Sequence, residues 1–200
     1  KYAIRNPHTW TLAIINFVSY ILYTHQNYFN PYLINVIGVS PEASGVFAII
    51  RTYVFMLLAI VGGIMCDRIF KSSGKWFMTA YSVSGILIIG LLLIPPGVSV
   101  IFVSIYTLIP AAFIMAQYGV QFSILRELNI SPAVMGTSIG VSSVISWLSD
   151  VIVPPIFGSW LDKYANAGYT YIFIFLIVDA AVGIAVAYTV VRYNKRKALG

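Results

Sequence analysis

The stretch GGIMCDRIFKSSGKW (residues 62–76) lies between two long apolar runs and gathers charge that the rest of the chain avoids. Only 9% of all residues are charged. Four of them nevertheless fall close together here: Asp67, Arg68, Lys71 and Lys75. A short charged loop between apolar runs is typical of helices that lie in lipid, because water and headgroups solvate the charges at the membrane surface. The solvent around the flanking runs therefore decides the fold.

Composition indicates that this solvent is lipid. The chain is 60% hydrophobic with a mean hydropathy of +0.89, whereas ordinary soluble domains are about 45–50% apolar. A single cysteine, Cys66, excludes an internal disulfide, and two isolated histidines form no metal-ligand cluster, so we expect no metal and no cofactor. The net charge of +6 lies at the edges of apolar runs. Because it forms no continuous basic patch, nucleic acid is not an expected partner.

The apolar runs have the length of membrane spans. A helix that crosses ~30 Å of hydrocarbon needs about 20 apolar residues. Six segments qualify: residues 10–29, 43–65, 76–94, 98–122, 134–157 and 169–191. Their connections are short and carry helix breakers, so sequential helices should be antiparallel neighbours. We predict an all-α membrane protein with a cytoplasmic segment (1–9), a six-helix bundle (10–191) and a cytoplasmic basic tail (192–200).

Basic residues predict the orientation. With the N-terminus inside, Lys163 lies outside and Arg51 lies within a span. The inner ends then hold Lys1, Arg5, Arg68, Lys71, Lys75, Arg126, Arg192, Lys195, Arg196 and Lys197. This asymmetry favours cytoplasmic termini by the positive-inside rule. Because the chain opens with KYAIRNPH, without Met or a secretory signal, we interpret it as a piece of a longer polypeptide that lacks an N-terminal portion.

The opening stretch carries a motif. The pattern Gly63-x-x-x-Asp67-Arg68-x-x-Lys71 resembles G-x-x-x-D-R-x-G-[RK]-[RK], the loop signature of the major facilitator superfamily, which follows the second helix of each six-helix half. The chain departs from it at Phe70, where the family usually has Gly, and at Ser72, where the family often has a basic residue. Six spans and the placement after span two strengthen the match, as does the pair Arg126-Glu127 in the next cytoplasmic loop.

The resemblance implies helices seven to twelve of a twelve-helix transporter, built as two three-helix repeats, in a bacterial inner (plasma) membrane. The implied partners are the lipid bilayer and the missing N-terminal six-helix half. In the family the signature latches the cytoplasmic helix ends, which implies a conformational latch of Gly63, Asp67, Arg68 and Lys71. The alternative is a positive-inside anchor with an incidental carboxylate.

Ionisable residues inside the spans point to function. Each costs at least ~2.5–3.5 kcal/mol near the bilayer centre, so it should face a cavity or a partner. Arg51 and Asp150 lie at similar depth and are expected to pair. Arg51 is then a substrate ligand or half of a structural ion pair, and Asp150 is its partner or a proton carrier. For Asp179, near the middle of the last span, the alternatives are a structural hydrogen bond and proton coupling.

Two polar stripes recur at helical spacing. The first, at intervals of four, three and four residues, is Asn16, Tyr20, Tyr23 and Asn27. The second is Tyr106, Pro110, Phe113, Gln117 and Gln121. In lipid such a face should turn inward, so we predict that these side chains line a substrate cavity, with interhelical hydrogen bonding as the alternative. Gly136-x-x-x-Gly140 predicts close packing of the fifth span against a neighbouring helix, with the missing half as one option.

These features predict a secondary active transporter that moves a small anionic solute by alternating access, as symporter or antiporter. The solute is an organic acid, a sulfonate or a phosphate-bearing molecule, because a guanidinium such as Arg51 holds these groups bidentately. A proton or a sodium ion is the candidate coupling ion. A transporter of neutral solutes such as sugars or drugs is the alternative, followed by a channel.

An enzyme is not expected. Residues 136–140 match G-x-S-x-G, the nucleophile elbow of serine hydrolases. A Ser138 nucleophile would need a base within ~3 Å. His25 lies far from Ser138 in depth, and His8 is a lone interfacial residue with no orienting acid in the sequence.

Overall fold

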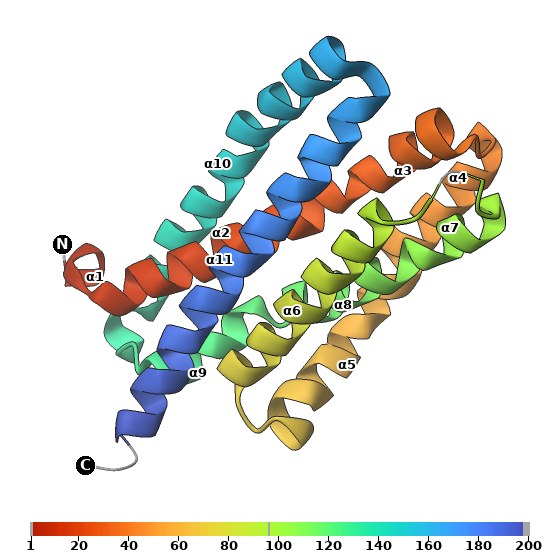
Figure 1. The fold of residues 1–200 in the computed structure, drawn as a ribbon. Coiled ribbons are helices and arrows are strands. Elements are labelled where there is room, and N and C mark those ends of the chain that lie inside the picture. The colour runs from red at the N-terminus through yellow and green to blue at the C-terminus, as the bar shows by residue number, and fades with distance from the viewer. Residues whose placement is uncertain (1, 96, 198–200) are drawn as a thin grey trace.

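The computed structural model describes residues 2–95 and 97–197, and each regular element in that part of the chain is helical. The described residues do not include Lys1 and 198–200, for which the sequence predicts a cytoplasmic location. Long helical rods run alongside one another and reverse at short connections (Figure 1). The α-helices are α1 (Tyr2–Arg5), α2 (Pro7–His25), α3 (Phe29–Tyr32), α4 (Pro41–Ile49), α5 (Leu58–Ile64), α6 (Ser73–Leu92), α7 (Val100–Tyr106), α8 (Leu108–Tyr118), α9 (Leu125–Leu128), α10 (Pro132–Tyr164) and α11 (Gly168–Lys197).

Tighter and wider helical turns join several of these helices into longer rods. The 3-10 segments are η1 (Gln26–Tyr28), η4 (Phe55–Leu57), η6 (Gln121–Ile124) and η7 (Ala165–Ala167). The π-helical segments are η2 (Leu33–Ile37), η3 (Ile50–Val54) and η5 (Met65–Ile69). The rod Pro41–Ile69 contains two of the π segments and is the least regular of the long rods. Such π turns often occur at functional positions.

Local sequence explains where the rods begin and turn. The Asn6 side chain accepts a hydrogen bond from His8 N at 2.9 Å, and Pro7 occupies the first turn of α2. Ser72 caps α6 by accepting from Lys75 N at 3.2 Å. These side chains satisfy N–H groups that a helix start leaves unpaired. Gly38, with φ of 82°, ends η2 in the left-handed conformation that glycine adopts without steric cost.

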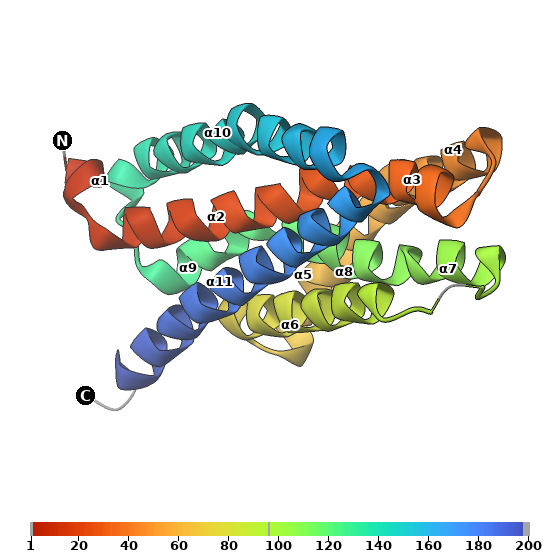
Figure 2. The same cartoon turned by 45° about the horizontal axis from the view of Figure 1, so that its top comes forward.

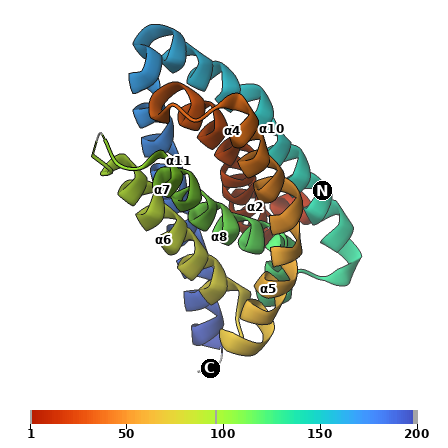
Figure 3. The same ribbon diagram turned by 90° about the vertical axis from the view of Figure 1, so that its right-hand side faces the viewer.

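The rods form one packed bundle. The pairs α6–α11 and α2–α10 make the most extensive contacts, and α2 also packs on α11 and α8 (Figure 2). Figure 3 shows α8 between α6 and α5. A Cβ atom on Gly62 would overlap the carbonyl oxygen of Ala116, so this glycine permits the close approach of α5 and α8. The core holds fully buried large side chains, including Leu12, Ile15, Phe77, Tyr81 and Leu176.

Four stretches of the described chain are long and apolar enough to cross a membrane: Pro41–Ile69, Ser73–Leu92, Val100–Tyr118 and Pro132–Lys197. The last stretch contains both α10 and α11, which reverse at η7. The first predicted span, 10–29, is helical through α2, η1 and the first residue of α3. It is not among the four, because polar side chains such as Asn16 and Ser19 lower its mean hydropathy. A crossing by α2, and the count of six, stay predictions.

The rod Pro41–Ile69 is covered least by the rest of the chain. Of the 18 consecutive residues that are most apolar in this rod, 11% are buried, whereas the corresponding share is 44% for Ser73–Leu92 and 50% for Val100–Tyr118. Its exposed side chains include Val46, Ile49, Met56, Leu57 and Ile60. A surface this apolar on a folded chain is suited to lipid or to another protein.

Candidate functional site

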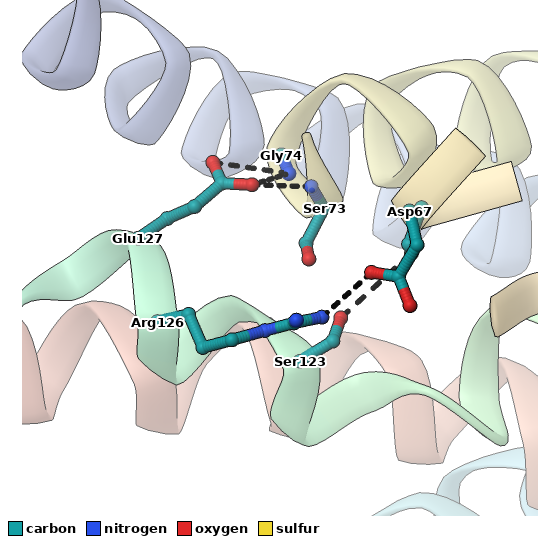
Figure 4. Close-up of polar contacts among 7 residues, drawn as sticks. Asp67, Ser73, Gly74, Ser123, Arg126 and Glu127 are labelled. Carbon is teal, nitrogen blue, oxygen red and sulfur yellow. Dashed lines mark hydrogen bonds and ion pairs between the residues drawn. The ribbon is translucent and has the colours of Figure 1, made fainter. Parts of the chain in front are cut away.

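Charged side chains from the short helical segments η5 and α9 meet at the end of the bundle where α6 begins (Figure 4). The Arg126 guanidinium donates to Asp67 Oδ1 at 2.8 Å, and the two side chains are 68% and 58% exposed. Ion pairs this exposed contribute about 0–1 kcal/mol because water screens them. The pair therefore links η5 to α9 with a contact that breaks and re-forms easily.

Glu127 makes the stronger contacts. Its carboxylate accepts from the backbone N–H groups of Ser73 and Gly74 at the start of α6. It also accepts from Ser72 Oγ at 3.2 Å and from Asn194 Nδ2, near the end of α11, at 3.0 Å. A carboxylate is favoured at a helix N-terminus by the unpaired N–H groups and by the helix dipole. Glu127 thus ties α9 to both α6 and α11.

A cavity of about 400 Å³ opens at this charged cluster. Its lining residues are Cys66, Asp67, Lys71, Ser72, Ser73, Arg126 and Glu127. Cys66 is buried and lies 3.8 Å from Ser123 Oγ, so the sole thiol of the sequence belongs to the wall. The cavity places two carboxylates and two cationic side chains around one hollow between the loops.

The predicted latch residues lie in different environments. Asp67 is paired and Lys71 lines the cavity, while Arg68 is exposed. A Cβ on Gly63 would meet nothing within 4 Å, and its neighbour Gly62 makes the tight helix contact instead. The latch itself stays a prediction.

The sequence pattern does not place Asn194 in the cluster, and it marks Glu127 only as half of the pair Arg126-Glu127. A sequence signal for the Glu127 contact exists. Ser72-Ser73-Gly74 marks a helix start with free N–H groups, and Glu127 is the acid in the next loop on the same side. The contact of Asn194 depends on how α11 crosses α6, which no local pattern encodes.

A second polar group lies halfway along the bundle. Tyr20 Oη donates to Asp150 Oδ2 at 2.7 Å. Asp150 is exposed, 18 residues after the start of α10 and 14 before its end. The Tyr23 and Tyr118 rings stack with centroids 3.9 Å apart, and the Tyr20 ring lies 6.1 Å from that of Tyr118. Predicted residues from α2 and α10 therefore meet α8 around one exposed carboxylate.

The expected Arg51–Asp150 pair is wrong. Arg51 is 3% exposed, donates from Nη1 to Thr107 Oγ1 at 3.0 Å, and lies 5.9 Å from the Phe29 ring centroid. Its Nη2 has no hydrogen-bond partner among the described residues. Equal depth did not bring the two charges together, because Arg51 points toward the α7–α8 junction whereas Asp150 points toward α2.

Several predicted cavity-lining residues are instead bonded inside the chain. Asn16 Nδ2 donates to Ser142 Oγ at 3.0 Å, and Gln117 Nε2 donates to Ser19 Oγ at 2.7 Å and to Tyr81 Oη at 3.3 Å. Both are interhelical hydrogen bonds, the alternative for this pattern. Of the other predicted cavity-lining residues, Asn27 is exposed, and Phe113 and Gln121 are half-buried.

Three remaining expectations have a clear placement. Asp179 is 8% exposed, and its Oδ2 has no partner among the described residues, so the structural hydrogen bond, one of the two alternatives for this residue, is not formed by Oδ2 there. Ser138 is buried against α2, where its Oγ lies 2.9 Å from Thr9 Oγ1. Gly136 and Gly140 face open space rather than a neighbouring helix of this chain.

The described chain is all-helical. Its long apolar helices and its similarity to inner membrane proteins both indicate an integral membrane protein. Over 198 residues it is 28% identical to the inner membrane protein YqcE of Escherichia coli (strain K12), a match that covers 96% of this chain and 46% of YqcE. It is 24% identical over 198 residues to the inner membrane protein YihN of the same organism, covering 97% of this chain and 47% of YihN. The chain thus spans about half the length of these curated relatives. No protein-family model matches it.

Proposed function

We propose that the chain is one six-helix half of a secondary transporter in the bacterial inner membrane, of the superfamily that its loop signature resembles. Its two halves would rock against each other and expose a solute site to either side in turn. The matches to about half of two inner membrane proteins support the location and the missing half. Both termini would lie in the cytoplasm, together with the charged cluster.

The exposure of Asp150 halfway along α10 carries this proposal. A carboxylate in contact with lipid at this depth would cost at least ~2.5–3.5 kcal/mol, so this face should border water or another part of the protein. The tyrosines around it offer rings and hydroxyls to a small solute. Asp150 is then the candidate carrier of a coupling proton or cation.

The solute class rests on Arg51. Its Nη2 has no hydrogen-bond partner within the described part of the chain, and η3, in which it lies, is a π-helical part of the least covered rod. A rearrangement of this irregular rod would present the guanidinium to an anionic solute, for which its planar donors are suited. An anionic solute is therefore the proposed cargo.

Counterflow tests the proposal. The full-length polypeptide is reconstituted in liposomes that are preloaded with unlabelled solute, and uptake of labelled solute is followed for a panel of organic acids, phosphate esters and neutral sugars. A carrier accumulates label transiently when loaded with its own solute. We expect this for one of the anions. Uptake that is equally fast with and without internal solute would indicate a pore and contradict the proposal.

A further inference from the structure

A second cavity, distinct from the solute face, lies between the start of α6 and the end of α11. Its volume is about 580 Å³. Its lining residues are Lys71, Ser72, Lys75, Glu127, Val191, Asn194 and Lys195. Three lysines from three separate segments thus surround one hollow that contains a single acid.

The lysines are available to a ligand. In the described chain the single salt bridge joins Arg126 to Asp67, so none of the three ammonium groups pairs with a carboxylate there. Glu127 is held by Ser72, Asn194 and the backbone of α6. Its carboxylate is engaged by the chain's own donors, and the cavity keeps a positive excess. That charge is suited to a phosphate group.

The walls of this cavity are fixed. A Cβ on Gly74 would lie 2.9 Å from Val191 Cγ2, so α6 and α11 already touch at its base. Lys71 has a φ of 50°, a left-handed conformation that ends the preceding helix and holds this residue at the rim. Lys75 lies in the first turn of α6 and Lys195 in the last turn of α11. The charges therefore converge by backbone placement.

A separate apolar groove lies deeper in the bundle along the same two helices. It has a volume of about 240 Å³ and is lined by Tyr81, Ser82, Gly85, Ile86, Ile89, Ile177, Ala180, Ala181 and Ile184. Ser82 lies two helical turns beyond Lys75, and Ile184 two turns before Val191, so cavity and groove share one face of each helix. The groove begins roughly 10 Å deeper in the bundle, by the 1.5 Å rise of a helix.

We propose that this cavity binds the headgroup phosphate of an anionic phospholipid whose acyl chain lies in the groove between α6 and α11. Basic pockets between helix ends at a membrane surface bind such headgroups, and lysine stems lie along apolar surface while their charges reach the headgroups. A free phosphate would use the lysines alone. A phospholipid uses both the lysines and the groove, and the site depends neither on the solute nor on the orientation.

The test measures lipid binding to the full-length protein in detergent by native mass spectrometry, with phosphatidylglycerol, phosphatidylcholine, glycerol phosphate and inorganic phosphate as probes. The variant combines Lys71→Asn, Lys75→Gln and Lys195→Gln, with Asn chosen because it tolerates a positive φ. The matched control removes three charges elsewhere, with Arg5→Gln, Lys163→Gln and Arg196→Gln. Lys195→Gln alone, at an exposed position, serves if the triple variant does not fold.

We expect phosphatidylglycerol to bind the wild type and the control within about twofold of each other, and the triple variant at least ~tenfold more weakly, since each basic residue near the surface contributes to anionic lipid binding. Ala181→Leu, which fills the groove, should weaken phosphatidylglycerol binding and leave inorganic phosphate unaffected. Equal losses in variant and control would mean that overall charge alone attracts the lipid. Glycerol phosphate or inorganic phosphate binding as tightly as phosphatidylglycerol would mean a free-anion site. Either result would overturn the proposal.

Discussion

Glu127 accepts hydrogen bonds from four groups on two helices, whereas Asp67 meets one guanidinium at the surface. Glu127→Gln should therefore lower the free energy of unfolding by about 1.5–3 kcal/mol, because hydrogen bonds to a charged group are lost. Asp67→Asn should lower it by less than ~1 kcal/mol. Thermal unfolding in detergent measures both. A larger loss of unfolding free energy for Asp67→Asn than for Glu127→Gln would mean that Asp67, and not Glu127, makes the main contact.

The separate partners of Arg51 and Asp150 can be tested with a double-mutant cycle on stability. Arg51→Ala and Asp150→Ala should add, with a coupling below ~0.5 kcal/mol, because the side chains have different partners. The control cycle, Tyr20→Phe with Asp150→Ala, removes an observed hydrogen bond and should show coupling of about 0.5–1.5 kcal/mol. Strong coupling between Arg51 and Asp150 would restore the ion pair that the structure does not form.

At the scale of helices, the adjacent glycines Gly62 and Gly63 of α5 differ in environment. Gly62→Ala would push a methyl group into the Ala116 carbonyl, so we expect it to destabilise the α5–α8 contact by about 1–3 kcal/mol. Gly63→Ala meets open space and should be neutral or stabilising, since alanine favours helix by up to ~1 kcal/mol over glycine. The thermal midpoints of the two variants measure this difference. The reverse order would contradict the packing of this rod.

Helix positions followed from sequence more readily than helix facing. Apolar runs and breakers such as Ser72 and Gly38 located the rods, because length and local backbone preference decide them. Periodicity also placed Asn16 and Tyr20 on one face of α2. It did not reveal that Asn16 would bond Ser142 while Tyr20 reached an exposed Asp150. That division depends on how α2 and α10 cross, which is a property of the packed bundle.

At the scale of the whole molecule, a single missing partner would explain all the uncovered surfaces. Three features stay uncovered in the packed bundle of the described residues: the pair Gly136 and Gly140, the rod Pro41–Ile69, and Asp150. The loop signature, by its family resemblance, implies a second six-helix half. A second half covering these surfaces would complete both the apolar contacts and the water-filled path that Asp150 needs.

The proposed function requires that Asp150 borders a water-filled path inside the membrane. The most direct measurement is the labelling rate of Asp150→Cys by a membrane-impermeant maleimide, in the full-length protein with Cys66→Ser and no other cysteine. Val178→Cys, at an exposed position within α11, is the lipid-facing control. We expect rapid labelling of Asp150→Cys, slowed by the transported solute, and little labelling of Val178→Cys. Labelling of Asp150→Cys no faster than that of Val178→Cys would contradict the proposed function.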